Sequence, residues 1–386
     1  MKTNKGIMWE LEQSLEEVKT ILPHKGYKYE VKNILLVTIC GLLCGQTTMK
    51  MIHKWFVSER VFEFFRKNFD FPPFKPCYSQ FTVVLGNIDA KSIGEVMYSW
   101  TKKLAGDLAD KTIAIDGKTI RSTANQRHRE NPLHIATAYV SELGLTLAQQ
   151  EVEGKTNEIK AVQELLETLD VKDSIVVADA LNCQKKTAKI IDKKGGTYLL
   201  SVKKNQSNTF FDVKAYFELE PEKFKKKVLT EKNRGRFETR EAYVLTDFEL
   251  AESLKKWCNI QAIGVVKTRF EENGKTTENI HYYISNSLLT PKNLLKHARL
   301  EWGIEAMHWL LDVHFNEDRC SVLNENTQIT LNLMRKIVLN CLKKHKADNS
   351  IKQPLTMIMA DNLFDCNNLL AFFSLSFLRL LLHFRF

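Results

Sequence analysis

The sequence TIAIDGKTIRST, residues 112–123, marks the point where the pattern of the chain changes from helical to β-rich. Its apolar residues, 113–115, predict a short buried strand that ends at Asp116. Asp-Gly is a common hairpin turn, so Asp116 and Gly117 on their own favour a turn. A catalytic acid at the end of a strand is the alternative, and it requires partner acids elsewhere in the chain.

The composition is that of a folded, basic protein. The chain has 386 residues, which is enough for two or three domains, and 44% of them are hydrophobic. Lysine and arginine outnumber aspartate and glutamate by 56 to 46, and the resulting charge of +10 suits a polyanionic partner such as nucleic acid. The eight cysteines include no C-x-x-C pair, which argues against a zinc ribbon and favours reduced thiols in a cytosolic protein.

Nothing in the sequence indicates a membrane protein. The first residues, MKTNKGIMWELEQ, lack the apolar region of a signal peptide. The apolar run ILLVTICGLLCG, residues 34–45, is shorter than the roughly 20 residues that a membrane span needs. The apolar tail, residues 369–386, is interpreted as a terminal core helix or an out-of-frame extension. We therefore expect a soluble, cytoplasmic protein that makes no contact with membrane.

The order of apolar patterns predicts an α/β fold. Strands are expected at residues 112–116, 134–140, 145–152, 174–179 and 197–202, with helices at 157–169 and 183–195. Three strands that form a meander, followed by two strands that each need a crossover helix, give the ribonuclease-H-like order.

Five segments are expected along the chain. They are a helical N-terminal domain (1–110), the first part of the ribonuclease-H-like core (111–206), a β-rich insertion (207–288), a helical segment that completes the core (289–346) and an atypical tail (347–386). Within the insertion, Asn273-Gly274 predicts a hairpin turn. Thr290 as N-cap and Pro291 at the first helical position mark the start of one long helix.

A second acid follows a second strand, because SIVVADALNCQ places Asp179 after an apolar run. In a ribonuclease-H-like sheet the first and fourth strands are parallel neighbours, so Asp116 and Asp179 would lie side by side. Two close carboxylates repel each other, and a divalent cation removes that cost. Oxygen ligands without cysteine or histidine select Mg²⁺ or Mn²⁺.

A third acid is expected from the helix that follows the insertion. In RLEWGIEAMHWLLDVHF, Glu305, His308 and Asp312 are spaced three and four residues apart and so share a helix face. An ordinary amphipathic helix with surface carboxylates is the alternative. With Asp116 and Asp179 already placed, Glu305 completes a catalytic and metal-binding triad. Two metal ions held by such a triad support an in-line phosphoryl displacement.

Several cations lie just past the strand ends on the same edge and could neutralise phosphates. For each of them a solvated side chain is an equal alternative. The predicted nucleic-acid contacts, with Arg236 of the GRFETR segment included, are Lys118, Arg121, Lys203, Lys204 and Arg236.

Seven segments in order resemble one known family over roughly residues 10 to 345. They are IAIDGKTIRS, KTNEIKAVQELLETL, VVADALNCQ, GGTYLLSVKKNQ, GRFETR, YYIS and EWGIEAMHWLLDVHFNED. The family is the H-repeat-associated (ISAs-type) insertion-sequence DDE transposases, and the upstream PCYSQFTVVLGNID resembles its associated N-terminal domain. The chain departs from the family's usual residues at Ala306, in place of Asn, and at Arg234, in place of His.

The resemblance implies a ribonuclease-H-like fold with a β insertion and two-metal DNA chemistry. It also implies action on the terminal inverted repeats of an element and on target DNA, with the acids at Asp116, Asp179 and Glu305. By analogy, a homodimer on DNA is expected. A catalytically inactive DNA-binding relic and a non-transposing nuclease of the same fold remain alternatives. A phosphatase is disfavoured, because no second Asp stands two residues after Asp116.

Overall fold

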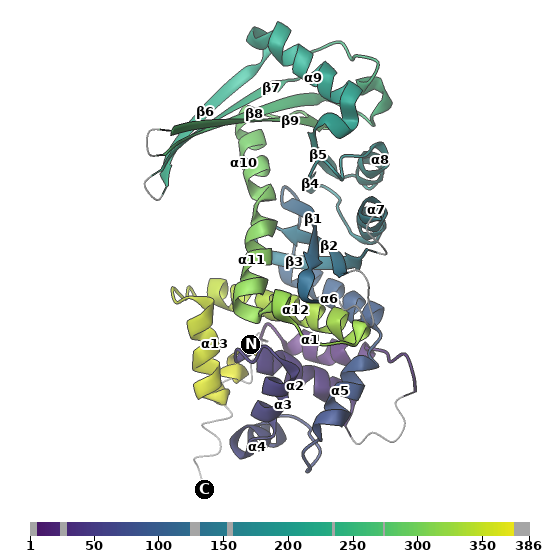
Figure 1. The fold of residues 1–386 in the computed structure, drawn as a ribbon, viewed down its shortest axis with the longest axis vertical. Coiled ribbons are helices and arrows are strands. Elements are labelled where there is room, and N and C mark those ends of the chain that lie inside the picture. Colours follow the sequence, from purple (N-terminus) through teal and green to yellow (C-terminus); the bar gives the residue numbers. More distant parts are fainter. Residues whose placement is uncertain are drawn as a thin grey trace, which may run out of the picture.

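In the computed structural model the chain is elongated, with a group of helices at one end and a long curved sheet extending from it (Figure 1). The structure describes residues 6–23, 29–123, 132–152, 157–233, 236–272 and 275–373. Among these described residues, no helix is long and apolar enough to cross a membrane.

The N-terminal part is helical, as the sequence predicted. Its helix α2 is buried along residues 33–43, because nearly every side chain there is apolar. The helical pattern of SLEEVKTIL, residues 14–22, does not continue as a helix beyond Glu17, since Val18 is already extended and Thr20 forms a β-bridge with Ile88. The helices are α1 (Trp9–Ser14), α2 (Val31–Leu43), α3 (Met49–Phe56), α4 (Glu59–Asn68), α5 (Tyr78–Gly86) and α6 (Ala90–Ala105).

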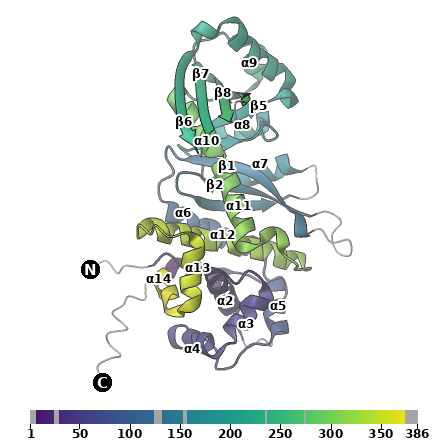
Figure 2. The same ribbon diagram turned by 60° about the vertical axis from the view of Figure 1, so that its left-hand side comes forward.

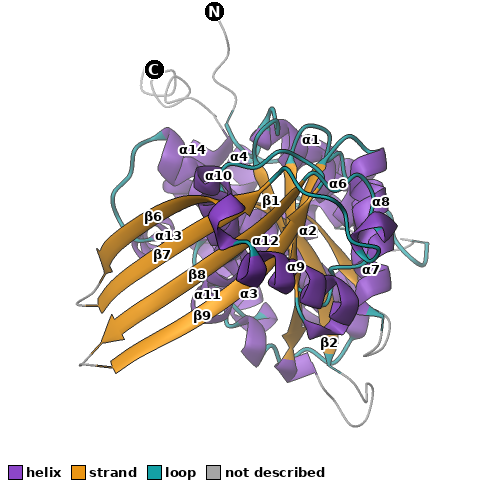
Figure 3. Ribbon diagram, turned by 90° about the horizontal axis from the view of Figure 1, so that it is seen from above, coloured by secondary structure: helices purple, strands orange, loops and turns teal. Residues whose placement is uncertain are grey.

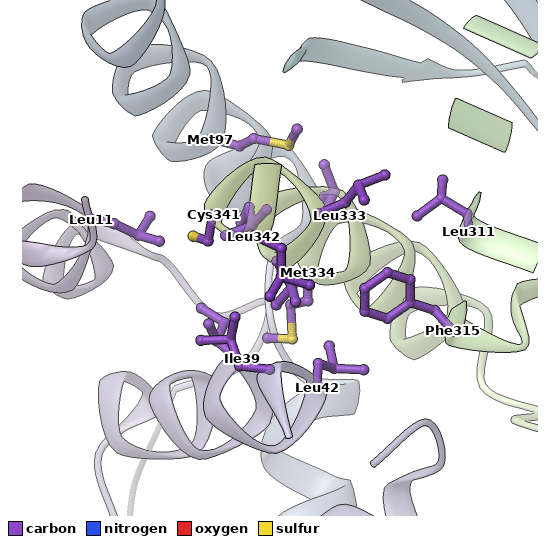
Figure 4. Close-up of a cluster of buried hydrophobic side chains, with 14 of the residues drawn as sticks. Leu11, Ile39, Leu42, Met97, Leu311, Phe315, Leu333, Met334, Cys341 and Leu342 are labelled. Carbon is purple, nitrogen blue, oxygen red and sulfur yellow. The ribbon is translucent and has the colours of Figure 1, made fainter. Parts of the chain in front are cut away.

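The core of this helical part is completed from the other end of the sequence. Helix α12 (Glu325–Asp348) packs between α2 and α6, so that Met334 lies close to Ile39 and Leu42 of α2 (Figure 4). The last helices, α13 (Leu355–Phe364) and α14 (Leu370–Phe373), cover the same core (Figure 2). The start of the apolar tail therefore lies in the core, whereas residues 374–386 fall outside the described part of the chain.

Within the described residues, nine strands form one mixed sheet in the order β3-β2-β1-β4-β5-β9-β8-β7-β6. The pairs β1–β2 and β2–β3 are antiparallel, whereas β1–β4 and β4–β5 are parallel. Helices α7 (Glu158–Thr168) and α8 (Lys185–Lys193) make the two crossovers, which confirms the predicted order of elements. The strands are β1 (Thr112–Ile120), β2 (Leu133–Val140), β3 (Leu145–Glu151), β4 (Ile175–Ala178), β5 (Thr197–Val202), β6 (Lys225–Asn233), β7 (Arg236–Leu245), β8 (Ala262–Glu272) and β9 (Lys275–Ser285).

Strand β1 does not end at Asp116, and Asp116-Gly117 is not a turn. The strand continues to Ile120, because β2 pairs with it along its whole length, from Ile113 with Val140 to Ile120 with Leu133. On its other side, β1 is paired only as far as Ile115, because the neighbouring strand β4 ends at Ala178. Asp116 therefore lies in mid-strand, at the point where one of the two neighbouring strands has ended.

The insertion extends the core sheet instead of packing against it (Figure 3). Strand β9 pairs antiparallel with β5, and β8, β7 and β6 follow in turn. The strands of the insertion agree with its predicted β-rich character, whereas helix α9 (Ser207–Leu219) was not predicted. Strand β6 was not expected either, because the lysines of KFKKKV suggest a solvated helix face. The predicted turn residues Asn273 and Gly274 lie outside the described residues.

The predicted long helix is two helices, α10 (Pro291–Glu301) and α11 (Gly303–Phe315), with Trp302 between them. Thr290 is the N-cap of α10, as predicted, and accepts a hydrogen bond from the backbone N–H of Asn293. The pair runs from the insertion strands past β1 to α12 (Figure 1). Short 3₁₀ turns lie at Leu15–Glu17, Arg121–Thr123, Lys204–Gln206, Pro221–Lys223, Leu254–Lys256, Glu317–Arg319 and Cys366–Leu369.

Candidate active site

Strand pairing brings the two aspartates together. The parallel register of β1 and β4 ends with Ile115 opposite Ala178, so Asp116 and Asp179 are the next residues on each chain. Neighbouring strands lie roughly 4.8 Å apart. The two aspartates are thus adjacent where the parallel pairing stops, which is the placement that the predicted topology requires.

A cavity of about 440 Å³ opens beside these aspartates. Glu305, in the first turn of α11, lines the same cavity and is exposed there. The structure therefore places all three predicted acids, Asp116, Asp179 and Glu305, around one cavity. Glu301, the last residue of α10, also lines it. Sequence reasoning missed Glu301, although it lies four residues before Glu305 and four-residue spacing puts helical side chains on one face.

Two acids of this cavity, Asp116 and Glu301, have a raised pKa, although the cations Lys203, Arg240 and Arg299 also line it. Burial raises the pKa of Asp116 to about 6, and the nearby charges of Asp179, Glu158 and Glu305 add to the shift. Burial likewise raises the pKa of Glu301 to about 7, with Asp179 and Asp116 contributing. A cation bound in the cavity would offset this repulsion.

The donor set fits a hard divalent cation, because the three predicted ligands supply only carboxylate oxygens. Within the described parts of the chain, however, no group of three or more His, Cys, Asp or Glu side chains is arranged to hold a metal ion. The acids share a cavity and influence one another's charge, but they do not form a closed ligand cage.

A chain of hydrogen bonds supports Asp179 from behind. Asn182, which is fully buried, donates from its backbone N–H and from Nδ2 to Asp179 Oδ1, at 3.1 and 3.0 Å. Asn182 Nδ2 also donates to Glu158 Oε1 at 2.9 Å, and Glu158 Oε2 lies 2.8 Å from His134 Nε2. The hydrogen bond from His134 lowers the pKa of Glu158. Since Asn182 joins both carboxylates, this network fixes the orientation of Asp179.

Gly117 makes room for this network. A Cβ atom at Gly117 would lie 2.7 Å from the Glu158 carboxylate and 2.7 Å from His134 Nε2, which is too close for either side chain. The Gly of the Asp-Gly pair is therefore needed for close packing beside Asp116, and not for a turn. Sequence reasoning missed Glu158, His134 and Asn182. Glu158 stands in KTNEI and Asn182 in VVADALNCQ, two segments that were quoted for the family resemblance.

Comparison with known proteins assigns the chain to a family. The family described as Transposase DDE domain matches residues 107–341, and the family described as DDE_Tnp_1-associated matches residues 13–101. The chain belongs to the DDE transposase family. The acids of the cavity fall within the matched DDE domain of this transposase.

Relatives in Escherichia coli cover most of the transposase. YncI of strain O157:H7 is 31% identical over 352 residues, which is 86% of this chain and 88% of that protein. The H repeat-associated YhhI of strain K12 is 30% identical over 87% of this chain and 92% of that protein. The H repeat-associated YbfD is 32% identical over 60% of this chain and 93% of that protein. The predicted resemblance to H-repeat-associated transposases is confirmed.

A solved piggyBac transposase synaptic complex with hairpin DNA is similar at a TM-score of 0.43 and 11% identity. The alignment covers 98% of this chain and 79% of that chain. A similarity with this TM-score does not support a conclusion about the structure or function of this transposase.

Lys118 of the transposase does not face the cavity's solvent. Its side chain is 13% exposed, and Nζ donates to Asp312 Oδ1 at 2.5 Å and to Glu317 Oε2 at 2.7 Å. Two carboxylates of the same chain therefore neutralise Lys118. This placement conflicts with the predicted contact between Lys118 and a DNA phosphate. Asp312, on the Glu305 face of α11, is used in this ion pair and does not line the cavity.

The other predicted DNA contacts differ in placement. Lys203 is exposed, lines the cavity and has no ion-pair partner among the described residues, whereas Lys204 is exposed next to it. Arg121 is exposed at the far end of β1, where its backbone N–H donates to Asp318 Oδ1. The side chain of Arg236 lies outside the described residues.

His308 approaches the site as a neutral group. Its Nδ1 lies 3.7 Å from Asp116 Oδ2, the distance of a weak ion pair. Burial lowers the pKa of His308 to about 3, and the charges of Lys336 and Lys118 add to that shift. The imidazole is therefore uncharged at neutral pH, and the contact with Asp116 is not an ion pair there.

Proposed function

We propose that this chain is an active transposase that cuts DNA at the inverted-repeat ends of its element and joins the freed ends to target DNA. The observation that carries the proposal is the placement of Asp116 and Asp179 on adjacent strands, with Glu305 lining the same cavity. We take strands β1 to β5, in the order β3-β2-β1-β4-β5, as the ribonuclease-H-like core of this enzyme.

In this proposal Asp116 and Asp179 hold both of two Mg²⁺ or Mn²⁺ ions, and Glu305 completes one of the two sites. When bound, such ions activate a water or a 3′-hydroxyl and stabilise the leaving oxygen of the phosphodiester. Asn182 and Glu158 orient Asp179 from behind. Lys203, which lines the cavity, and Lys204, which is exposed next to it in the chain, neutralise phosphates near the reacting bond.

The partners follow from the same proposal. The substrate is double-stranded DNA that carries the terminal inverted repeats, and the second substrate is target DNA. A homodimer that holds both ends would act in the cytoplasm at the nucleoid. Residues 1–110 would form the associated domain, 207–288 the insertion, and 111–206 with 289–346 the catalytic core, followed by the tail 347–386.

The test is Asp179→Asn, assayed for cleavage of a labelled duplex that carries the element's terminal repeat, with Mg²⁺ and with Mn²⁺. Asparagine keeps an oxygen that can accept from Asn182, so the fold should persist, whereas the metal-binding charge is lost. We expect cleavage to disappear while the binding of the duplex is retained. Asp170→Asn, which removes an exposed ion pair with Lys102, is the matched control and should cleave normally.

Three results would contradict the proposal in different ways. Normal cleavage by Asp179→Asn would show that the metal site is wrong. Cleavage by the unaltered protein without any strand joining would indicate a nuclease of the same fold. Binding of the repeat without nicking, even with Mn²⁺, would indicate a DNA-binding relic.

A further inference from the structure

A second, larger cavity of about 950 Å³ lies between the N-terminal helices and α12, apart from the acidic site. Its walls come from α3, α5, the start of α12 and the segment that follows α11. Among the described residues, no aspartate or glutamate lines this cavity, whereas three cations do, namely Lys50, Arg319 and Arg335. The catalytic cavity differs, because its lining combines the acids Asp116, Asp179, Glu301 and Glu305 with the cations Lys203, Arg240 and Arg299.

Arg335 is the unusual member of this set. It is 2% exposed, and its Nε is buried without a hydrogen-bond partner. Among the described residues, no carboxylate pairs with it. A guanidinium stays charged at every physiological pH, and a buried charge without a partner is costly. The next residue, Lys336, is also buried but has hydrogen-bond partners, because its Nζ donates to Thr137 and Gln149.

The surroundings of Arg335 suit an anion. Asn324, Thr327, Leu331 and Arg335 recur at three- and four-residue spacing, so one face of α12 forms a wall of the cavity. The N-terminal ends of α12 and of α3, with its N-cap Thr48, open on the same space. Helix N-terminal ends present free N–H groups and attract negative charge, which adds to the three cations.

Helix α11 connects this cavity to the catalytic one. Glu305, in its first turn, lines the acidic cavity, and Asn316, just after its last turn, lines the basic one. Glu305 and Asn316 are 11 residues apart, which corresponds to roughly 17 Å at 1.5 Å per helical residue. A DNA strand advances about 3.4 Å per nucleotide, so these two residues are separated by about five nucleotides.

We propose that the basic cavity binds a backbone phosphate of the substrate DNA, with Arg335 as its main contact, about five nucleotides from the phosphate that reacts. The inference rests on the proposed function, because it takes DNA as the substrate. The charge-assisted contact between guanidinium and phosphate would satisfy the buried charge of Arg335. Lys50 and Arg319, both exposed at the cavity, would assist it.

The test compares the unaltered chain with Arg335→Met, which keeps an unbranched apolar side chain in place of the arginine stem and removes the charged guanidinium. Two quantities are measured, the affinity for a terminal-repeat duplex at several salt concentrations and the melting temperature with and without sodium phosphate. We expect Arg335→Met to bind the duplex about tenfold more weakly at low salt. The slope of log affinity against log salt should fall by about one.

The melting temperature separates a binding role from a structural one. Without an anion, Arg335→Met should melt at the same temperature as the unaltered chain or higher, because an unpaired buried charge has been removed. The gain in melting temperature that phosphate gives the unaltered chain, relative to chloride at equal ionic strength, should disappear. Lys336→Met is the matched control. It removes a neighbouring buried cation that does not line the cavity, and its response to phosphate should stay normal.

Each other outcome overturns the inference. If Arg335→Met binds the duplex with unchanged affinity and salt slope, DNA does not use this cavity. A response to phosphate that depends on Arg335, without any effect on DNA affinity, would show a site for a small phosphate compound instead. If the unaltered chain binds no DNA but responds to phosphate, the proposed function has failed while the anion site remains.

Discussion

Replacing Lys336 by methionine should change how stability depends on pH. Lys336 is 2% exposed, and its Nζ donates to Thr137 Oγ1 at 2.9 Å and to Gln149 Oε1 at 2.6 Å. Burial lowers the pKa of Lys336 to about 7. An unfolded lysine titrates near pH 10.4. Between these values the unfolded chain is protonated at this residue and the folded chain is not.

The sign and size of the effect follow from proton linkage. Because the unfolded state binds the extra proton, the Lys336 contribution to the free energy of unfolding rises with pH above 7, by about 1.4 kcal/mol per pH unit. From pH 7 to pH 10 this amounts to roughly 4 kcal/mol. Methionine does not titrate. The free energy of unfolding of Lys336→Met, relative to the unaltered chain, should therefore fall by that amount over the interval.

At pH 10 the variant should be the less stable protein, because Thr137 and Gln149 have lost their donor and an unsatisfied buried group costs about 1–3 kcal/mol. At pH 7 the loss of the buried charge should cancel or outweigh that cost. Urea unfolding at pH 7, 8, 9 and 10 measures the difference. Lys343→Met is the control, because burial lowers the pKa of Lys343 to about 8 and its slope should begin one unit later. A difference between Lys336→Met and the unaltered chain that stays constant from pH 7 to 10 would refute the reasoning.

Two further predictions concern the catalytic cavity. Glu305→Gln should abolish metal-dependent cleavage without loss of DNA binding. Glu301→Gln should retain cleavage, because a pKa of about 7 leaves the Glu301 carboxyl protonated in a large fraction of molecules at neutral pH. Equal losses in a cleavage assay would show that Glu301 is also a ligand. Gly117→Ala should push Glu158 away from His134 and slow cleavage by at least tenfold, while the protein stays folded. A normal cleavage rate would show that the hydrogen-bond network behind Asp179 does not matter for cleavage.

The sequence was sufficient to predict the central sheet and the neighbouring aspartates. Apolar runs before Asp116 and Asp179, together with the rule that crossovers join parallel strands, determine which strand ends meet. The continuation of β1 past Asp116 was not predictable in this way, because it depends on the length of β2 and not on the residues of β1.

The position of the cations was harder to predict, because their partners are distant in the sequence. Lys118 is buried by Asp312 and Glu317, which lie 194 and 199 residues further along the chain. No local pattern distinguishes it from Lys203, which stays exposed. Strand β6 was missed for a related reason, since its lysines suggest a solvated helix and only pairing with β7 makes it a strand.

The order of the sheet has a consequence for how two copies of the chain can meet. One outer strand, β6, begins with three consecutive lysines, Lys225–Lys227, and charged edge strands resist pairing with a further chain. The other outer strand, β3, is in contact with α6, α7 and α12. Because one rim repels added strands and helices shield the other, a dimer would associate through side chains on its helices and loops instead of by continuing the sheet across the interface.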